Sequence, residues 1–359
     1  MTPMLKSAVV AVTLLTVGIS AQAPRLINGM AGPNLLKGKA PEQGYVPDAW
    51  QPHPGSLLKY SVEIRFGEEP ETMPPGMKFG RVSAVTTDAQ NDVYVFKRDA
   101  ATDQIVVFNS DGQYLRSWGK GMFTRPHGLR IDRDQNVWAI DDGGHQVFKF
   151  SRDGRLLQSW GVKGVSGTDA KTFNRPTDVA WDSKGNAYIS DGYGNSRVVK
   201  LDKAGNYVTA WGTPGDREGQ FRVPHSIAVD SRDRVYVSDR ENNRIQIFDE
   251  HGRFLKQWTH LGCSQGVFIT PNDELWIITH RNNSENITYD GLAGQLMKID
   301  AESGKVLGAL ESPGHMLTVA PNREIYVASL TGNVFKWQPD PWWPRRAHEA
   351  KRAGMPPPK

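Results

Sequence analysis

The feature that most restricts the fold of this chain is a pattern that recurs six times, once every forty to fifty residues. Each copy contains a short apolar segment with an aromatic residue at its second position. These segments are VYVF at Val93, VWAI at Val137, AYIS at Ala187, VYVS at Val235, LWII at Leu275 and IYVA at Ile325. Self-similarity at this period is typical of architectures in which each repeat packs on its neighbours.

Each repeat consists of short runs of β-branched and aromatic residues between polar turns. A second run that ends in an Asp/Gly turn follows the aromatic segment, as in QVFKFSRDG and NRIQIFDEHG, and several repeats end with a third run such as LLQSWG. Such runs are typical of β-strands, and helical periodicity is nearly absent. A single sheet leaves both faces exposed, whereas six sheets arranged radially bury them. The sequence therefore predicts an all-β, six-bladed β-propeller.

The sixth repeat is one strand short. It ends at NVFKWQPD, while KYSVEIRFG, which begins at Lys59, has a strand pattern but belongs to no repeat. We predict that this N-terminal strand pairs with the last blade and closes the ring. The predicted propeller domain spans residues 58–340.

The two ends of the chain differ from the repeats in composition. Residues 1–23 contain Lys6, an apolar run from Ala8 to Ile19, and small residues at Ala21 and Ala23, which is typical of a secretory signal peptide. The sequence thus predicts export to the periplasm or the extracellular space, with no stable membrane span after the signal is removed. We expect residues 24–57 to be an N-terminal extension and residues 341–359 a disordered, basic, proline-rich tail.

Charge and cysteine content restrict the partners and the covalent structure. The formal net charge is +4 over 359 residues, and no basic stretch is interleaved with aromatic residues, so a nucleic-acid surface is not expected. The sequence instead predicts a small-molecule or peptidyl substrate and a monomeric protein. Cys263 is the only cysteine, which excludes an intramolecular disulfide.

One position in each repeat lies eleven residues before the aromatic residue. These six ring positions are Ser83, His127, Thr177, His225, Gln265 and His315. In a propeller the first strand of each blade lines the central channel, so the ring positions encircle the axis at one height, with histidine in every second blade. Three converging imidazoles predict a metal site with an open position, as catalytic zinc requires. Other divalent ions also bind imidazole, and histidines that only line the channel are the alternative.

Two arginines and a tyrosine follow the aromatic segments on the same rim. Arg98 and Arg240 stand four residues past the aromatic residue of their repeats, and Tyr193 stands five residues past it. Guanidinium groups there could bind a carboxylate in two places, and a phenol near a metal could act as a general base. The alternative is structural, with arginines in ion pairs between blades and a tyrosine that only packs.

Several motifs resemble the peptidyl-α-hydroxyglycine α-amidating lyase family, the lyase half of the peptide-amidating enzymes. They include RPHGL, DGYGNSR, GQFRVPHSIAV and DRENNR, and the resemblance runs from about Val85 to Trp337. DGYGNSR and DRENNR are more specific than the general NHL-type propeller repeats, which the chain also resembles. The resemblance implies cleavage of an α-hydroxyglycine to a peptide amide and glyoxylate.

The resemblance also implies roles for individual residues. His127, His225 and His315 fall on the family's three zinc ligands, the same residues that the register selects. Tyr193 matches the family's tyrosine base, which removes the hydroxyl proton of the substrate. Arg98 and Arg240 match two active-site arginines that lie around the substrate carboxylate and the tyrosine.

The sequence departs from the family pattern at two positions. Met316 replaces an aspartate that binds a structural calcium ion in the family. The main-chain carbonyls of Val85 and Leu129 are then the ligands left for a weak calcium site. Gly194 replaces a cysteine, so the family's disulfide is absent.

Two other function classes compete with the lyase. One is a non-catalytic NHL-type propeller that binds a ligand or a protein partner on its rim, with histidines as polar lining. The other is a hydrolase resembling the gluconolactonases, which use acidic ligands around the axis, where this chain has imidazoles. Metal content separates the lyase from the binding propeller.

Overall fold

A computed structural model describes residues 60–63, 73–279, 294–312 and 314–339, all of which lie within the predicted propeller domain of residues 58–340. The predicted signal peptide (1–23), extension (24–57) and tail (341–359) lie outside the described residues. The described chain is all-β, and its regular helix is one short 3-10 turn, η1 (Arg240–Asn242). No helix in these ranges is long and apolar enough to span a membrane.

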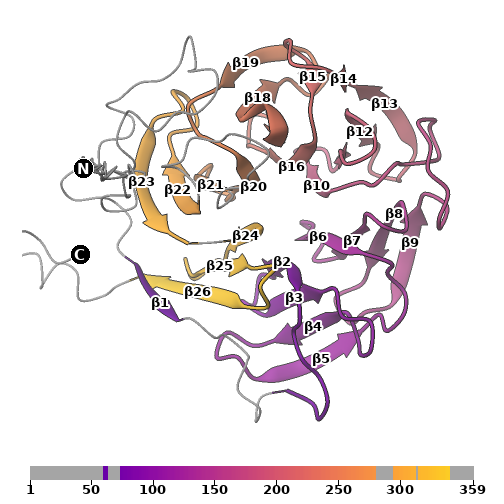
Figure 1. The fold of residues 1–359 in the computed structure, drawn as a ribbon, viewed down its shortest axis with the longest axis vertical. Helices are drawn as coiled ribbons and strands as arrows, with labels where there is room; N and C mark the ends of the chain where they lie inside the picture. The colour runs from indigo at the N-terminus through magenta and orange to yellow at the C-terminus, as the bar shows by residue number, and fades with distance from the viewer. Residues whose placement is uncertain (1–59, 64–72, 280–293, 313, 340–359) are drawn as a thin grey trace, which may run out of the picture.

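Six four-stranded antiparallel sheets surround one axis and form the blades of a propeller (Figure 1). From the axis outward, blade one contains β2 (Val82–Thr87), β3 (Val93–Lys97), β4 (Ile105–Phe108) and β5 (Tyr114–Trp118). Blade two contains β6 (Pro126–Ile131), β7 (Val137–Asp141), β8 (Gln146–Phe150) and β9 (Leu156–Trp160). Blade three contains β10 (Asp178–Trp181), β11 (Ala187–Asp191), β12 (Arg197–Leu201) and β13 (Tyr207–Trp211).

The second half of the ring repeats this order. Blade four contains β16 (Pro224–Val229), β17 (Val235–Asp239), β18 (Arg244–Phe248) and β19 (Phe254–Trp258). Blade five contains β20 (Ser264–Ile269), β21 (Leu275–Thr279), β22 (Gln295–Ile299) and β23 (Val306–Glu311). Blade six contains β24 (Met316–Val319), β25 (Ile325–Ala328), β26 (Val334–Pro339) and β1 (Tyr60–Glu63). A parallel pair, β14 (Thr213–Pro214) and β15 (Gln220–Phe221), lies between blades three and four along the chain.

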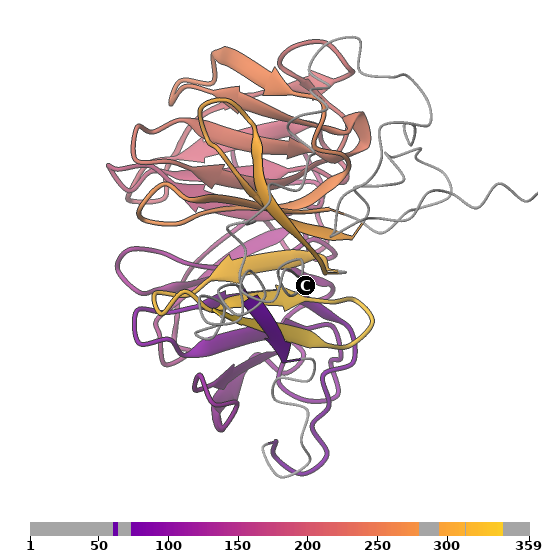
Figure 2. The same ribbon diagram turned by 90° about the vertical axis from the view of Figure 1, so that its left-hand side faces the viewer.

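The ring is closed by the innermost strands and by the N-terminal strand. Going round the axis, β2, β6, β10, β16, β20 and β24 each contact the next, and β24 contacts β2. At the outer edge of blade six, β1 pairs antiparallel with β26, from Tyr60 opposite Pro339 to Glu63 opposite Lys336. Both views show the indigo β1 beside the yellow β26 (Figures 1 and 2). The predicted six-bladed propeller, with its N-terminal strand in the last blade, is confirmed.

In blades one to four, the aromatic residue of the repeat holds the turn that precedes it by a hydrogen bond to an aspartate. In blade two the Trp138 indole donates to Asp132 at 2.9 Å, and in blade three the Tyr188 hydroxyl donates to Asp182 at 3.0 Å. Each aspartate also accepts from the main-chain N–H four residues later, which closes the turn between the first and second strands. A turn of constant length keeps the aromatic residue and the ring position in constant register.

The hydrophobic core lies between neighbouring blades. One cluster joins Trp138 and Ile140 of blade two to Val179 and Ile189 of blade three. Similar clusters occur at the other blade contacts in the described part of the ring. Because each sheet buries both faces against its neighbours, the propeller holds the inner strands in fixed positions around the axis.

Removal of β1 is expected to destabilise the ring. Deleting residues 1–63 leaves the outer edge of β26 unpaired, and the melting temperature should fall by roughly 5 °C or more. Deleting residues 1–57, which ends before the propeller, is the matched control and should leave melting unchanged. Differential scanning calorimetry measures both, and equal melting of the two proteins would contradict a closing role for β1.

Candidate metal centre

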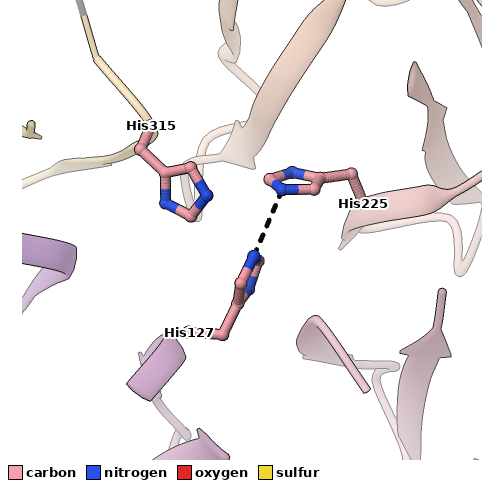
Figure 3. A group of neighbouring side chains, drawn as sticks. All are labelled: His127, His225 and His315. Carbon is pink, nitrogen blue, oxygen red and sulfur yellow. Dashed lines mark hydrogen bonds between the residues drawn. The ribbon is translucent and has the colours of Figure 1, made fainter. Parts of the chain in front are cut away.

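The three in-register histidines meet at the axis of the propeller (Figure 3). His127 lies on β6, His225 lies on β16, and His315 directly precedes β24. All three side chains are buried, and one ring nitrogen from each lies within 4.8 Å of the others. Among the residues that the structure describes, this is the one group of three or more His, Cys, Asp or Glu side chains placed to hold a metal ion.

Main-chain carbonyls fix the orientation of all three imidazoles. Each Nδ1 atom lies within hydrogen-bond distance of the carbonyl oxygen at the ring position of the next blade: Thr177 at 2.7 Å from His127, Gln265 at 2.5 Å from His225, and Ser83 at 2.6 Å from His315. A carbonyl oxygen only accepts, so each Nδ1 carries the proton and each Nε2 keeps its lone pair. This arrangement of ligand and supporting carbonyl is common in metal sites, so the donor set fits a divalent ion that binds imidazole.

His127 and His225 are buried enough to remain neutral. Burial lowers the pKa of His127 well below its usual value of 6.5, and the nearby His315 and Arg98 lower it further. Burial also lowers the pKa of His225, with additional repulsion from Arg240. Neutral imidazole is the form that binds a metal ion.

Tyr193 brings a hydroxyl group to the same point. Its oxygen lies 2.9 Å from Nε2 of His225, 3.1 Å from Nε2 of His127 and 3.3 Å from Nη1 of Arg240. Burial disfavours the charge on Arg240, but the neighbouring Tyr193 and Glu241 raise its pKa. The structure thus brings Tyr193 and Arg240 together with His127 and His225.

Arg98 lies at the edge of this group. Its Nε atom donates to the carbonyl oxygen of Pro126 at 3.1 Å, directly before His127 in the chain. Its charge is close enough to lower the pKa of His127. Arg98 therefore contributes positive charge beside the histidines and touches the strand that carries one of them.

Two further arginines, Arg125 and Arg175, lie against the Tyr193 ring, and neither is among the site residues predicted from the sequence. The guanidinium carbons of Arg175, Arg240 and Arg125 lie 4.9, 5.3 and 5.6 Å from the centre of the Tyr193 ring. Arg125 also pairs with the buried Asp142, whereas Arg175 has no ion pair among the described residues. Both stand two residues before a ring position, so the count that found the histidines could have found them. Together these arginines surround Tyr193 with positive charge, part of which the ion pairs Arg125–Asp142 and Arg240–Glu241 neutralise.

Carboxylates at the ends of second strands hold the loops that carry these side chains. Asp141, at the end of β7, accepts from the main-chain N–H groups of Thr124 and Arg125 at 2.8 and 2.6 Å. Asp239, at the end of β17, accepts from the N–H of Arg222 at 2.7 Å. Each carboxylate thus holds the loop that leads into an inner strand, and each of these strands begins with Pro-His. The held loop helps to keep the histidine at the axis.

The residues proposed for a calcium site lie within the inner strands. Val85 is buried on β2, and Leu129 is buried on β6. The side chain of Met316 packs in the same apolar cluster as Leu129 and Ala84. The position of the family's aspartate is therefore filled by an apolar contact.

Known proteins resemble the chain over most of the propeller. The NHL repeat family matches residues 173–201 and 221–248. Peptidyl-glycine α-amidating monooxygenase A of Xenopus laevis is 37% identical over 329 residues, which cover 80% of this chain and 34% of that protein. The chain thus spans about a third of the length of this curated relative.

A second relative matches over most of its own length. The probable peptidyl-α-hydroxyglycine α-amidating lyase of Caenorhabditis elegans is 31% identical over 256 residues, covering 67% of this chain and 72% of that protein. Among solved structures, a streptogramin B lyase superposes with a TM-score of 0.55 at 13% identity, covering 79% of this chain and 99% of that one, which supports the fold alone. With its NHL repeats and these relatives, the chain belongs to the β-propeller family of the peptidyl-α-hydroxyglycine α-amidating lyases.

Proposed function

We propose that the protein is a metal-dependent lyase that cleaves the carbon–nitrogen bond of a carbinolamide, with an N-acyl-α-hydroxyglycine as substrate. The products are an amide and glyoxylate. The proposal rests on one observation above all: three buried histidines converge on the axis, with the Tyr193 hydroxyl 2.9 Å from one of them. The names of the relatives support the same reaction class.

The Nε2 atoms of His127, His225 and His315 would hold the metal, which we propose to be zinc. When bound, zinc supplies a Lewis acid that favours loss of a proton from a hydroxyl group. Three protein ligands leave a position open, as in catalytic zinc sites. The carbonyls on the three Nδ1 atoms keep the imidazoles oriented and add to their basicity.

Tyr193 is the proposed general base. Its phenolate form would take the hydroxyl proton of the substrate, and the two electrons of that O–H bond form the carbonyl of glyoxylate. The carbon–nitrogen bond breaks and its electron pair stays on nitrogen. Nitrogen takes a proton to give the amide, and Tyr193 gives up the proton that it accepted, so the balance of protons is unchanged. The substrate has the same atoms as the two products together, so no water or oxidant is consumed. The guanidinium groups of Arg240, Arg125 and Arg175 lie over the Tyr193 ring and place positive charge beside it.

The arginines also indicate that the substrate is negatively charged. We assign Arg98 and Arg240 to the carboxylate of the hydroxyglycine, because paired guanidinium groups bind carboxylates with good geometry. Arg175 lies beside them without an ion pair among the described residues and adds to the attraction for an anion. We also propose that the protein is exported and acts as a monomer.

Metal analysis tests the proposal directly. We expect the purified protein to contain about one zinc ion per chain by elemental analysis and to release glyoxylate from an N-acyl-α-hydroxyglycine. Dialysis against a chelator should remove both the metal and the activity, and added zinc should restore both. A folded protein that neither contains nor binds zinc would support a non-catalytic binding propeller instead.

A further inference from the structure

A buried arginine with no role in the proposed mechanism lies on the same strand as one of the three histidines. Arg130 follows His127 by three residues on β6, and its side chain is only 7% exposed. It forms a two-pronged pair with Asp178 of β10, Nε to Oδ1 at 2.9 Å and Nη2 to Oδ2 at 2.7 Å. Asp178 is fully buried, so the pair is shielded from water.

The rest of the guanidinium reaches three further blades. Nη1 donates to the carbonyl oxygen of Leu317 on β24 at 3.1 Å, and Nη2 donates to that of Val267 on β20 at 3.1 Å. The Ser226 hydroxyl on β16 lies 3.4 Å from Nη2 and donates to Asp178 at 2.6 Å. One side chain thus connects the inner strands of blades two to six across the channel.

The carbonyls that Arg130 binds belong to a second ring, two residues beyond the ring positions. Val267 follows Gln265 by two residues, and Leu317 follows His315 by two. By the same count, this ring contains the carbonyls of Val85 and Leu129, which the sequence leaves as calcium ligands. The Arg130 guanidinium therefore places its positive charge against two carbonyl oxygens of the ring that a second metal ion would use as ligands.

The strands that Arg130 connects carry the ligands and their supporting carbonyls. Ser226 is the next residue after His225, and Asp178 is the next after Thr177, whose carbonyl orients His127. A shift of β10 or β16 would change the position of an imidazole or of its Nδ1 acceptor. The Arg130 contacts therefore lie next to the residues that place and orient the imidazoles.

We propose that Arg130 is a positioning residue for the three-histidine centre, and that its guanidinium acts as a built-in axial cation in place of a second bound metal ion. This inference rests on the proposed metal site. It predicts that metal binding at the histidines depends on Arg130, which acts through its hydrogen bonds to Asp178 and to main-chain carbonyls of the neighbouring inner strands. It also predicts that calcium does not stabilise the protein.

Cobalt(II) binding provides a readout that does not depend on catalysis. Arg130→Met leaves the buried Asp178 carboxylate without its positive partner, and the variant is expected to fold poorly. The double variant Arg130→Met/Asp178→Asn removes both charges and keeps an oxygen to accept from Ser226, so it should fold. We expect it to bind cobalt roughly 10- to 100-fold more weakly than the parent, with a changed visible absorption spectrum of the bound ion.

Arg133→Met is the matched control. Arg133 lies three residues further along the chain, is exposed, and makes one long contact to the Ser183 carbonyl oxygen at 3.4 Å. Its loss should leave both cobalt affinity and spectrum unchanged. Thermal unfolding of the parent with and without calcium completes the set, and we expect the two melting temperatures to agree.

The outcomes separate this inference from the proposed function. A folded double variant with the affinity and cobalt spectrum of the parent would overturn the positioning role but leave the metal site intact. A parent protein that melts at a clearly higher temperature with calcium would overturn the proposal that the Arg130 guanidinium takes the place of a second metal ion. A parent that binds no cobalt or zinc would overturn both the inference and the metal-dependent function.

Discussion

Replacing His225 with alanine is expected to remove the bound metal and to lower glyoxylate release roughly 1000-fold. The side chain would supply one of three nitrogen ligands, and the two imidazoles that remain should hold a divalent ion far more weakly. Loss of Lewis-acid stabilisation worth several kcal/mol corresponds to a rate effect of about this size. Elemental analysis and a glyoxylate assay on the same preparation measure both effects.

His251→Ala is the control for this substitution. The His251 side chain is exposed and lies at a turn of blade four, where its ring faces Glu250 at 3.7 Å. Metal content and turnover should match those of the parent protein. Full activity of the folded His225→Ala protein would eliminate the lyase mechanism that we propose.

Replacing Tyr193 with phenylalanine is expected to separate metal binding from catalysis. The substitution removes one oxygen, the one that lies 2.9 Å from His225 and 3.3 Å from Arg240, and leaves the ring to pack against the arginines. Zinc content should stay at that of the parent, whereas turnover should fall by roughly 10²- to 10⁴-fold, the usual contribution of a positioned general base. Steady-state kinetics combined with metal analysis give both quantities.

Tyr207→Phe provides the comparison at an exposed position. Tyr207 lies on β13, the outer strand of blade three, and is 42% exposed. The Tyr207→Phe substitution should change neither zinc content nor turnover. Unchanged turnover in Tyr193→Phe would remove the phenol from the mechanism, and loss of zinc would instead give that residue a role in holding the metal.

The positive charge around Tyr193 was only partly predictable. Counting four residues past the aromatic residue of a repeat identifies Arg98 and Arg240. Arg125 and Arg175 instead stand two residues before a ring position, in the loops that lead into inner strands. Their positions depend on main-chain hydrogen bonds from other strands, such as those that Asp141 accepts. These contacts join residues sixteen or more positions apart, which no short motif reveals.

Arg130 shows a second limit of reading the sequence. In the sequence, Arg130 is the first residue of RID, directly after RPHGL, and it looks like an ordinary polar position on an inner strand. Its partners come from four other blades, up to 187 residues away in the chain. Only closure of the ring brings them within hydrogen-bond distance of one guanidinium.

The sequence by itself determined the number of blades, the strand that closes the ring, and the three histidines that share one height on the axis. It could do so because a constant turn, held by residues such as Trp138 and Asp132, converts a count along the chain into a position in space. The tertiary structure alone decided which nitrogen each imidazole turns toward the axis and which arginines surround Tyr193. Those features depend on contacts between blades, and such contacts exist only once all six sheets have packed against one another.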